Sequence, residues 1–139
     1  MIVWGGWVGD RFLDDGAAFD PVANRWRSLA PSPLTGRFGT PSGTVAQVPG
    51  VWTGEEMLVW GEGAGVEDTD PGAPTGAAYD PAADQWRVLA PAPVLPRIAV
   101  PVWTGHEMLV WGGQSGRRYF DDGAAYDPAT DRWRTLPSS

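Results

Sequence analysis

The side chains best suited to bind a charged ligand are Arg37 and Arg97, which each precede a predicted inner strand. A guanidinium group presents several N–H donors in one plane and binds carboxylates through paired hydrogen bonds. If the chain folds as a ring of sheets, as the repeats described below predict, these two side chains would lie near its axis and would favour an anionic ligand. An ion pair with a neighbouring sheet is the alternative role for both.

Further candidates for ligand binding lie in predicted loops, where they could stack on a sugar ring or donate hydrogen bonds to a protein or glycan partner. These candidates are Trp7, Arg11, Arg117, Arg118 and Tyr119. Each has a simpler alternative role. Trp7 could cover its own loop, and the arginines could be solvated surface charges.

Few residues could support metal binding or catalysis. The sequence has no Cys and a single His, His106, which excludes Cys-ligated and His-rich metal sites and leaves no thiolate nucleophile. The acidic run Glu67–Asp70 could supply oxygens to Ca²⁺, but it lacks the glycine turn of an EF-hand loop and is interpreted as a solvated loop. We therefore expect no cofactor, no metal site and no catalytic residues.

The charge of the chain narrows the partners further. Ten arginines, no lysine and seventeen acidic residues give a net charge of −7, which disfavours nucleic acid and anionic membrane surfaces. The first residues lack the basic segment and apolar core of an export signal, and no apolar run is long enough to span a membrane. The compartment stays open, and export or cell-surface display is compatible with a longer parent chain.

The segments expected to form the strands that position these residues occur three times in the sequence. "MIVWGG", "MLVWG" and "MLVWGG" begin at Met1, Met57 and Met108. "GAAFDP" and two copies of "GAAYDP" begin at Gly16, Gly76 and Gly123, and each is followed by a Trp–Arg pair. The repeat is close to fifty residues long and nothing in it has helical spacing. Such a repeat of short strands is typical of propeller blades.

The third copy shows the four strands expected in a full unit. Apolar runs bounded by Gly, Pro and Asp predict strands over Ile98–Trp103, Met108–Trp111, Ala124–Asp127 and Arg132–Leu136. The first copy has no counterpart of the innermost strand, because Met1 already stands at the position of Met57 and Met108. The pattern therefore predicts eleven strands in an open arc of sheets.

A double Gly after an apolar strand, followed by a Tyr and then a Trp, resembles the kelch repeat, and the fuller pattern is similar to kelch proteins of bacteria. The residues that fill this motif are Gly5, Gly6, Phe19, Trp26, Tyr79, Trp86, Gly112, Gly113, Tyr126 and Trp133. The first copy has Phe in place of Tyr, and the second has Gly61–Glu62 in place of the double Gly. The resemblance implies an all-β, partial β-propeller of about three kelch-like four-stranded blades, in which these residues build the fold.

The predicted boundaries place an incomplete blade at 1–36, a second blade with loop insertions at 37–96 and a third at 97–139. Closed propellers usually have four to eight blades, so an arc of three leaves apolar faces open. Two chains could join as a homodimer with a six-bladed ring. Alternatively, the blades belong to a longer parent chain, which is favoured because a start inside a blade is typical of truncation.

The face expected to bind a partner carries the loops between the second and third strands of each blade and the connections between blades, and we name it the loop-bearing face. These loops differ in length between the copies, whereas the turns on the other face do not. Variable loops on a rigid scaffold often carry function. The predicted function is therefore a non-catalytic module that binds, or acts as a scaffold for, a protein or carbohydrate.

Two other functions remain open. Kelch-like propellers include sialic-acid epimerase or mutarotase enzymes, and a fragment of such a sugar-isomerising enzyme could work with Arg, Glu and Asp alone. They also include a copper oxidase, whose His ligands and cross-linked Cys have no equivalent here. The third possibility is that these are purely structural blades of a larger surface protein.

Overall fold

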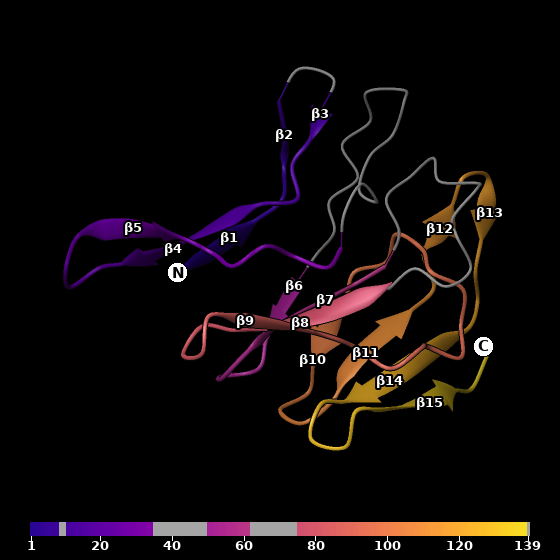
Figure 1. Cartoon of the computed structure of the whole chain (residues 1–139). Helices are drawn as coiled ribbons and strands as arrows, with labels where there is room; N and C mark the ends of the chain where they lie inside the picture. The colour runs from indigo at the N-terminus through magenta and orange to yellow at the C-terminus, as the bar shows by residue number, and fades with distance from the viewer. Residues whose placement is uncertain (9–10, 35–49, 62–74, 139) are drawn as a thin grey trace.

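The computed structural model describes residues 1–8, 11–34, 50–61 and 75–138, and all regular structure in these ranges is β (Figure 1). Three antiparallel sheets follow one another along the chain. The first has the order β1 (Ile2–Trp4), β4 (Gly16–Asp20), β5 (Arg25–Ser28). The second is β6 (Gly50–Trp52), β7 (Met57–Trp60), β8 (Gly76–Asp80), β9 (Gln85–Val88). The third is β10 (Val102–Trp103), β11 (Met108–Trp111), β14 (Gly123–Asp127), β15 (Arg132–Leu136).

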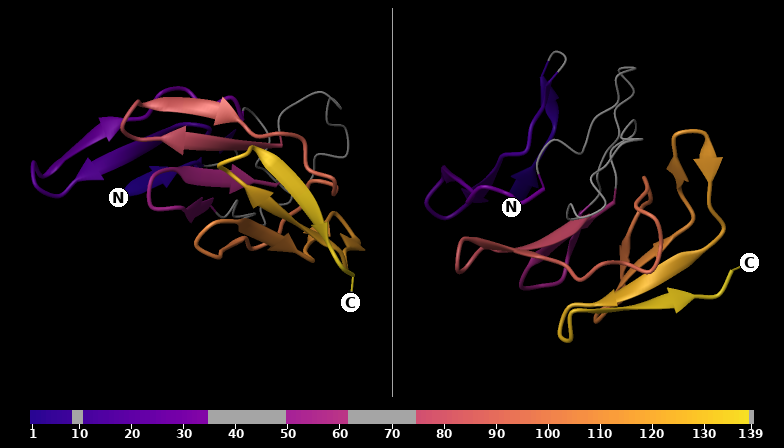
Figure 2. Two further views of the ribbon diagram at one scale, coloured as in Figure 1. Left: turned by 90° about the horizontal axis from the view of Figure 1, so that it is seen from below. Right: turned by 45° about the vertical axis from the view of Figure 1, so that its right-hand side comes forward.

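The sheets stack side by side as three blades of a partial β-propeller, with the two termini at opposite ends of the arc (Figure 2). This confirms the predicted fold class. The first blade has three strands because β1 has no strand on its inner side among the described residues. The three blades share one register, in which Phe19, Tyr79 and Tyr126 pair with Trp26, Trp86 and Trp133.

Matching turns explain why the last two strands of each blade form the same hairpin. The side chains of Asp20, Asp80 and Asp127 each accept a hydrogen bond from the backbone N–H two residues later, at 2.8 to 2.9 Å. Four positions further on, Asn24, Asp84 and Asp131 have φ angles of 48°, 53° and 52°. Asn and Asp tolerate this left-handed conformation better than most residues. The local sequence therefore fixes the hairpin.

The inner strand of the third blade is shorter than predicted. We expected it to cover Ile98–Trp103, but β10 begins at Val102. Pro101 has no N–H to donate to a sheet, which limits pairing at this point. Ile98 instead exchanges two backbone hydrogen bonds with Gln114, at 2.9 and 3.0 Å. The connection into the third blade is thus attached to the loop that follows β11.

The hydrophobic core lies between the blades rather than within any one of them. Between the first two blades, Leu34, Val59 and Ala77 are buried against Trp4 and Trp86. The cluster between the second and third blades is larger, and its buried members are Leu58, Trp60, Ala78, Leu89, Met108, Val110, Ala124 and Tyr126. Burial of these apolar surfaces drives the stacking of the sheets.

Each end of the stack exposes a tryptophan whose equivalents at the inner faces are buried or half-buried. Trp26 on the first blade is 50% exposed and Trp111 on the third is 47% exposed. Their equivalents at the inner faces contact each other: Trp86 packs on Trp4, with 5.6 Å between ring centroids. Trp133 packs on Trp60 in the same way, also at 5.6 Å. Each open face therefore carries one half of a repeated aromatic contact.

Two small hairpins, which the sequence pattern did not predict, stand between the second and third strands of the outer blades. They consist of β2 (Trp7–Val8) with β3 (Arg11–Phe12), and β12 (Gln114–Ser115) with β13 (Arg118–Tyr119). Both project from the same side of the sheets, and the turns that join β8 to β9 and β14 to β15 lie on the other side (Figure 1). The hairpins therefore rise from the loop-bearing face.

Candidate functional site

The β12–β13 hairpin presents three of the predicted ligand-binding residues. Its two-residue turn has Gly116 first, with φ 57°, followed by Arg117. A glycine at this place suits two-residue hairpin turns, which need a positive φ there. Arg117, Arg118 and Tyr119 are all exposed, and Tyr119 is 79% exposed. The turn thus holds two cations and an aromatic ring together at the surface.

Arg97 lies beneath this hairpin and is buried. Its Nε donates to the carbonyl oxygen of Leu95 at 2.9 Å, and its Nη1 forms an ion pair with Asp122. The guanidinium carbon is 3.8 Å from the centroid of the Phe120 ring, and that of Arg118 is 4.8 Å from the same centroid. Cations at this distance from an aromatic ring are attracted to it. Arg97 therefore supports the hairpin from below.

The ion pair of Arg97 has an electrostatic consequence. Hydrogen bonding to the guanidinium lowers the pKa of the Asp122 carboxyl below its ordinary value. Arg97 therefore forms an ion pair, as in the alternative role given above. Its partner, Asp122, lies in the same blade and not in a neighbouring one. Its Nη2 is buried with no hydrogen-bond partner among the described residues.

The other predicted site residues lie partly outside the described structure. Trp7 and Arg11 lie in β2 and β3, whose backbones pair, but their side chains are outside the description. Arg37 and the acidic run Glu67–Asp70 lie outside the described residues. Sequence reasoning missed Phe120, the ring shared by the two arginines. The signal that could have identified it is the adjacency of basic and aromatic residues in "RRYF".

An open pocket of about 560 Å³ lies between this hairpin and the exposed side of the third blade. Trp111, Gln114, Tyr119 and Phe120 are among its lining residues. A larger cavity of about 1090 Å³ is lined by residues of the first two blades, among them Phe19, Trp26, Trp52 and Met57. Both cavities border exposed aromatic rings, which are surfaces suited to binding rather than to proton transfer.

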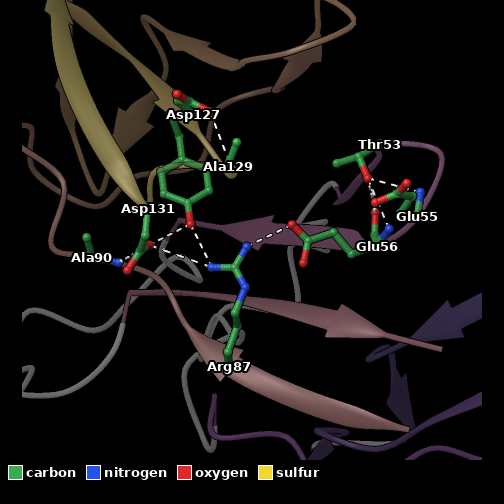
Figure 3. Close-up of polar contacts among 9 residues, drawn as sticks. Thr53, Glu55, Glu56, Arg87, Ala90, Asp127, Ala129 and Asp131 are labelled. Atoms are coloured by element: carbon green, nitrogen blue, oxygen red, sulfur yellow. Dashed lines mark hydrogen bonds and ion pairs between the residues drawn. The ribbon is translucent and has the colours of Figure 1, made fainter. Parts of the chain in front are cut away.

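A second polar site joins neighbouring blades and is built around Arg87 (Figure 3). Arg87 extends from β9 between Glu56 and Asp131, and donates to Glu56 Oε1 at 2.7 Å. Its Nη1 donates to the Tyr126 hydroxyl at 2.8 Å, and that hydroxyl donates to Asp131 Oδ1 at 2.6 Å. The N–H of Ala90 also donates to Asp131, at 3.0 Å. One arginine therefore ties the second blade to the third.

The joint between the first two blades repeats this arrangement. Arg27 donates to the Tyr79 hydroxyl at 3.0 Å and to Asp84 Oδ1 at 2.9 Å. The N–H of Ala30 donates to Asp84 at 3.2 Å, and its carbonyl oxygen accepts a hydrogen bond from Trp86 Nε1 at 2.9 Å. Trp133 Nε1 makes the same bond to the Ala90 carbonyl at 2.8 Å. The two joints share the Arg, Tyr, Asp, Trp and Ala positions, and the Glu56 that holds Arg87 has no counterpart beside Arg27 among the described residues.

Burial and hydrogen bonding at the joints shift the pKa values of the paired tyrosines and aspartates in opposite directions. Desolvation raises the pKa of the Tyr126 hydroxyl far above its ordinary value, and it also raises the pKa of Tyr79. The hydrogen bond from Tyr126 lowers the pKa of the Asp131 carboxyl, and that from Tyr79 lowers the pKa of Asp84. Each joint thus holds a neutral tyrosine beside an ionised aspartate.

Two further observations concern only the described ranges. No three His, Asp or Glu side chains there gather into a group that could hold a metal ion. No helix in these ranges is long and apolar enough to span a membrane.

Comparison with known proteins places the third blade in a family. Residues 102–139, which run from the start of β10 past the end of β15, match the family model described as the Kelch motif. A search of curated proteins finds no match.

The fold of the whole chain is similar to that of a solved structure titled "Structure of YjhT", with a TM-score of 0.66 and 18% sequence identity. The similarity covers 99% of this chain and 48% of the other, so this chain spans about half the length of that structure. At this identity the likeness concerns the fold alone. Residues 102–139 therefore carry a kelch motif, and the described sheets of the chain have the fold of part of a β-propeller.

Proposed function

We propose that this chain is a non-catalytic binding module that engages a partner through the β12–β13 hairpin of its loop-bearing face. The observation that carries the proposal is the exposed group Arg117, Arg118 and Tyr119 at a projecting turn. Kelch propellers commonly mediate protein interactions, which agrees with a binding role.

The chemistry of the hairpin supports an acidic partner. In a chain with a net charge of −7, two adjacent arginines make a local cationic site that an acidic group can approach. Guanidinium groups favour carboxylates, and the neighbouring Tyr119 ring offers an apolar face for stacking. An acidic glycan or an acidic peptide would satisfy both features. Arg118 is already held against Phe120, which reduces the entropy cost of binding.

Binding to a glycan array and to a set of acidic peptides tests this proposal with the R117A/R118A variant. We expect the wild-type chain to bind at least one acidic ligand and the variant to bind it at least tenfold more weakly. The matched control is R25A/R132A. It removes two exposed arginines at the opposite side of the sheets, beside the β4–β5 and β14–β15 turns. Equal loss in both variants would contradict a specific site on the hairpin.

Two outcomes would favour the other functions. Turnover of an anomeric sugar by the wild-type chain would support a sugar-isomerising fragment of the epimerase or mutarotase kind. Failure to bind any ligand in either set would support purely structural blades of a larger protein. Asp122, on the loop-bearing face, forms an ion pair with Arg97. It is therefore not a free general base for sugar isomerisation.

A further inference from the structure

Each joint between neighbouring blades consists of two halves. The earlier blade in the chain contributes the outgoing half, and the next blade contributes the incoming half. The outgoing half consists of the second-strand Trp and the fourth-strand Arg of one blade, such as Trp60 and Arg87. The incoming half consists of the Tyr, Asp and Trp of the next blade, such as Tyr126, Asp131 and Trp133. Each half is completed only when the other is present.

The third blade exposes an outgoing half that has no partner among the described residues. Trp111 is 47% exposed and the side chain of Arg134 is 57% exposed. Glu107 holds Arg134 through two hydrogen bonds, at 2.9 and 2.7 Å, as Glu56 holds Arg87. Both bonds use Nε and Nη2, and no hydrogen bond from Nη1 of Arg134 is seen among the described residues. In Arg87, Nη1 is the atom that reaches the next blade.

The first blade exposes an incoming half that differs from the other two in chemistry. Phe19 replaces the tyrosine, so the hydroxyl is missing, and Asn24 replaces the aspartate, so the carboxylate is missing. Only Trp26 is retained, and it is 50% exposed. An arginine that met this face would find neither the hydroxyl nor the negative charge that Arg27 and Arg87 find.

We infer that the open face of the third blade docks a β-blade that carries Tyr, then Asp five residues later and Trp two residues after that, and not the first blade of a second copy. This spacing is the one at Tyr79, Asp84 and Trp86. The carboxylate would complement Arg134, and the indole would cover Trp111. The inference rests on the repeated joints and is independent of the proposed hairpin site.

One residue of the third blade alters the joint in detail. Pro137 stands at the position of Ala30 and Ala90 and has no N–H, so a docked Asp would accept from the tyrosine and from Arg134 only. The Pro137 carbonyl oxygen still offers an acceptor for the indole N–H of the incoming Trp. The main contacts of the joint are therefore retained.

The double variant F19Y/N24D tests the inference, because it gives the first blade the incoming half of the other two. Asp fits at position 24, since Asp84 and Asp131 have nearly the same φ as Asn24. We expect sedimentation velocity to show that F19Y/N24D associates with itself at least tenfold more tightly than the wild-type chain. Adding R134A to this variant should return association to the wild-type level.

The controls separate a specific joint from a change in charge or folding. V22D places the same charge on Val22, an exposed residue of the same turn, and should leave association unchanged. Far-UV circular dichroism checks that each variant is folded, and N24D alone, which restores only the carboxylate, should give an intermediate effect. Wild-type self-association as tight as that of F19Y/N24D would overturn the inference, as would a folded F19Y/N24D that associates no better than the wild type.

Discussion

Tyr126 is the residue on which the joint between the second and third blades converges. Its hydroxyl accepts from Arg87 and donates to Asp131, and its side chain is fully buried. A buried hydroxyl that makes both hydrogen bonds stabilises the fold. If it were absent, Arg87 and Asp131 would each lack a hydrogen-bond partner, which would destabilise the folded state. The tyrosine therefore links the apolar core to the polar rim of the joint.

Removal of this hydroxyl should be costly. We expect Y126F to lower the free energy of unfolding by about 1–2 kcal/mol, because Arg87 and Asp131 each lose a buried hydrogen-bond partner. Urea unfolding followed by tryptophan fluorescence measures the change. The control is Y119F, since Tyr119 is 79% exposed and should change stability little. Equal effects in the two variants would contradict the role of the joint.

The aspartates of the joints should make the protein sensitive to acid. The carboxyl pKa values of Asp84 and Asp131 are lower in the folded chain than in the unfolded one. Their contribution to stability is therefore complete above the unfolded pKa of about 4 and is lost as the pH falls through the lower folded values. The urea concentration at the midpoint of unfolding should decrease when the pH falls below about 4, and it should decrease less in D84N/D131N. A D84N/D131N variant that drops as steeply as the wild type would refute this assignment.

At the level of elements, the turn after the second strand shows where glycine is required. Gly113 has a φ of 95°, and a Cβ there would collide with the carbonyl oxygen of Ile98. Gly6 holds the same motif position with a φ of 117°, and a Cβ there would meet nothing within 4 Å. The difference arises because Ile98 pairs beside the third-blade turn, and no described strand does so beside the first.

This pair of glycines gives a matched comparison. We expect G6A to lower the free energy of unfolding by about 1–2 kcal/mol, the cost of a positive φ alone. G113A should cost more, because the added methyl group also forces Ile98 away from Gln114. Thermal unfolding of both variants measures the difference. If G113A proved no worse than G6A, the close approach of Ile98 would not limit the turn.

The repeated strands could be predicted from the sequence, and the small hairpins could not. The strand over Met108–Trp111 and the strand over Arg132–Leu136 occur as expected, because apolar runs between turn residues define them locally. The β12–β13 hairpin has only two residues in each strand, too few for a hydrophobic pattern. The ion pair of Arg97 with Asp122 depends on how distant segments pack, which local spacing does not encode.

For the whole molecule, burial increases from the first blade to the later ones. None of the described side chains in β1, β4 and β5 is buried, whereas most of those in β7, β8 and β14 are. Backbone hydrogen bonds near few buried apolar contacts open more readily. The first blade should therefore be the least stable part of the described stack.

Hydrogen exchange should show this gradient directly. We expect amides in β4 and β5 to exchange faster than those in β8 and β14, because the first blade packs against its neighbour through the smaller of the two core clusters. Exchange followed by mass spectrometry resolves the strands. Uniform protection across the three blades would mean that the stack opens as a single cooperative unit.

The joints also bear on how such a chain can grow. The second blade carries both the incoming half, on β8, β9 and the turn between them, and the outgoing half, on β7 and β9. A tandem duplication of the stretch that encodes this blade would therefore supply every residue that the additional joint requires. The chain can lengthen by whole blades with each existing contact preserved, whereas gain or loss of a single strand would leave one joint without its counterpart.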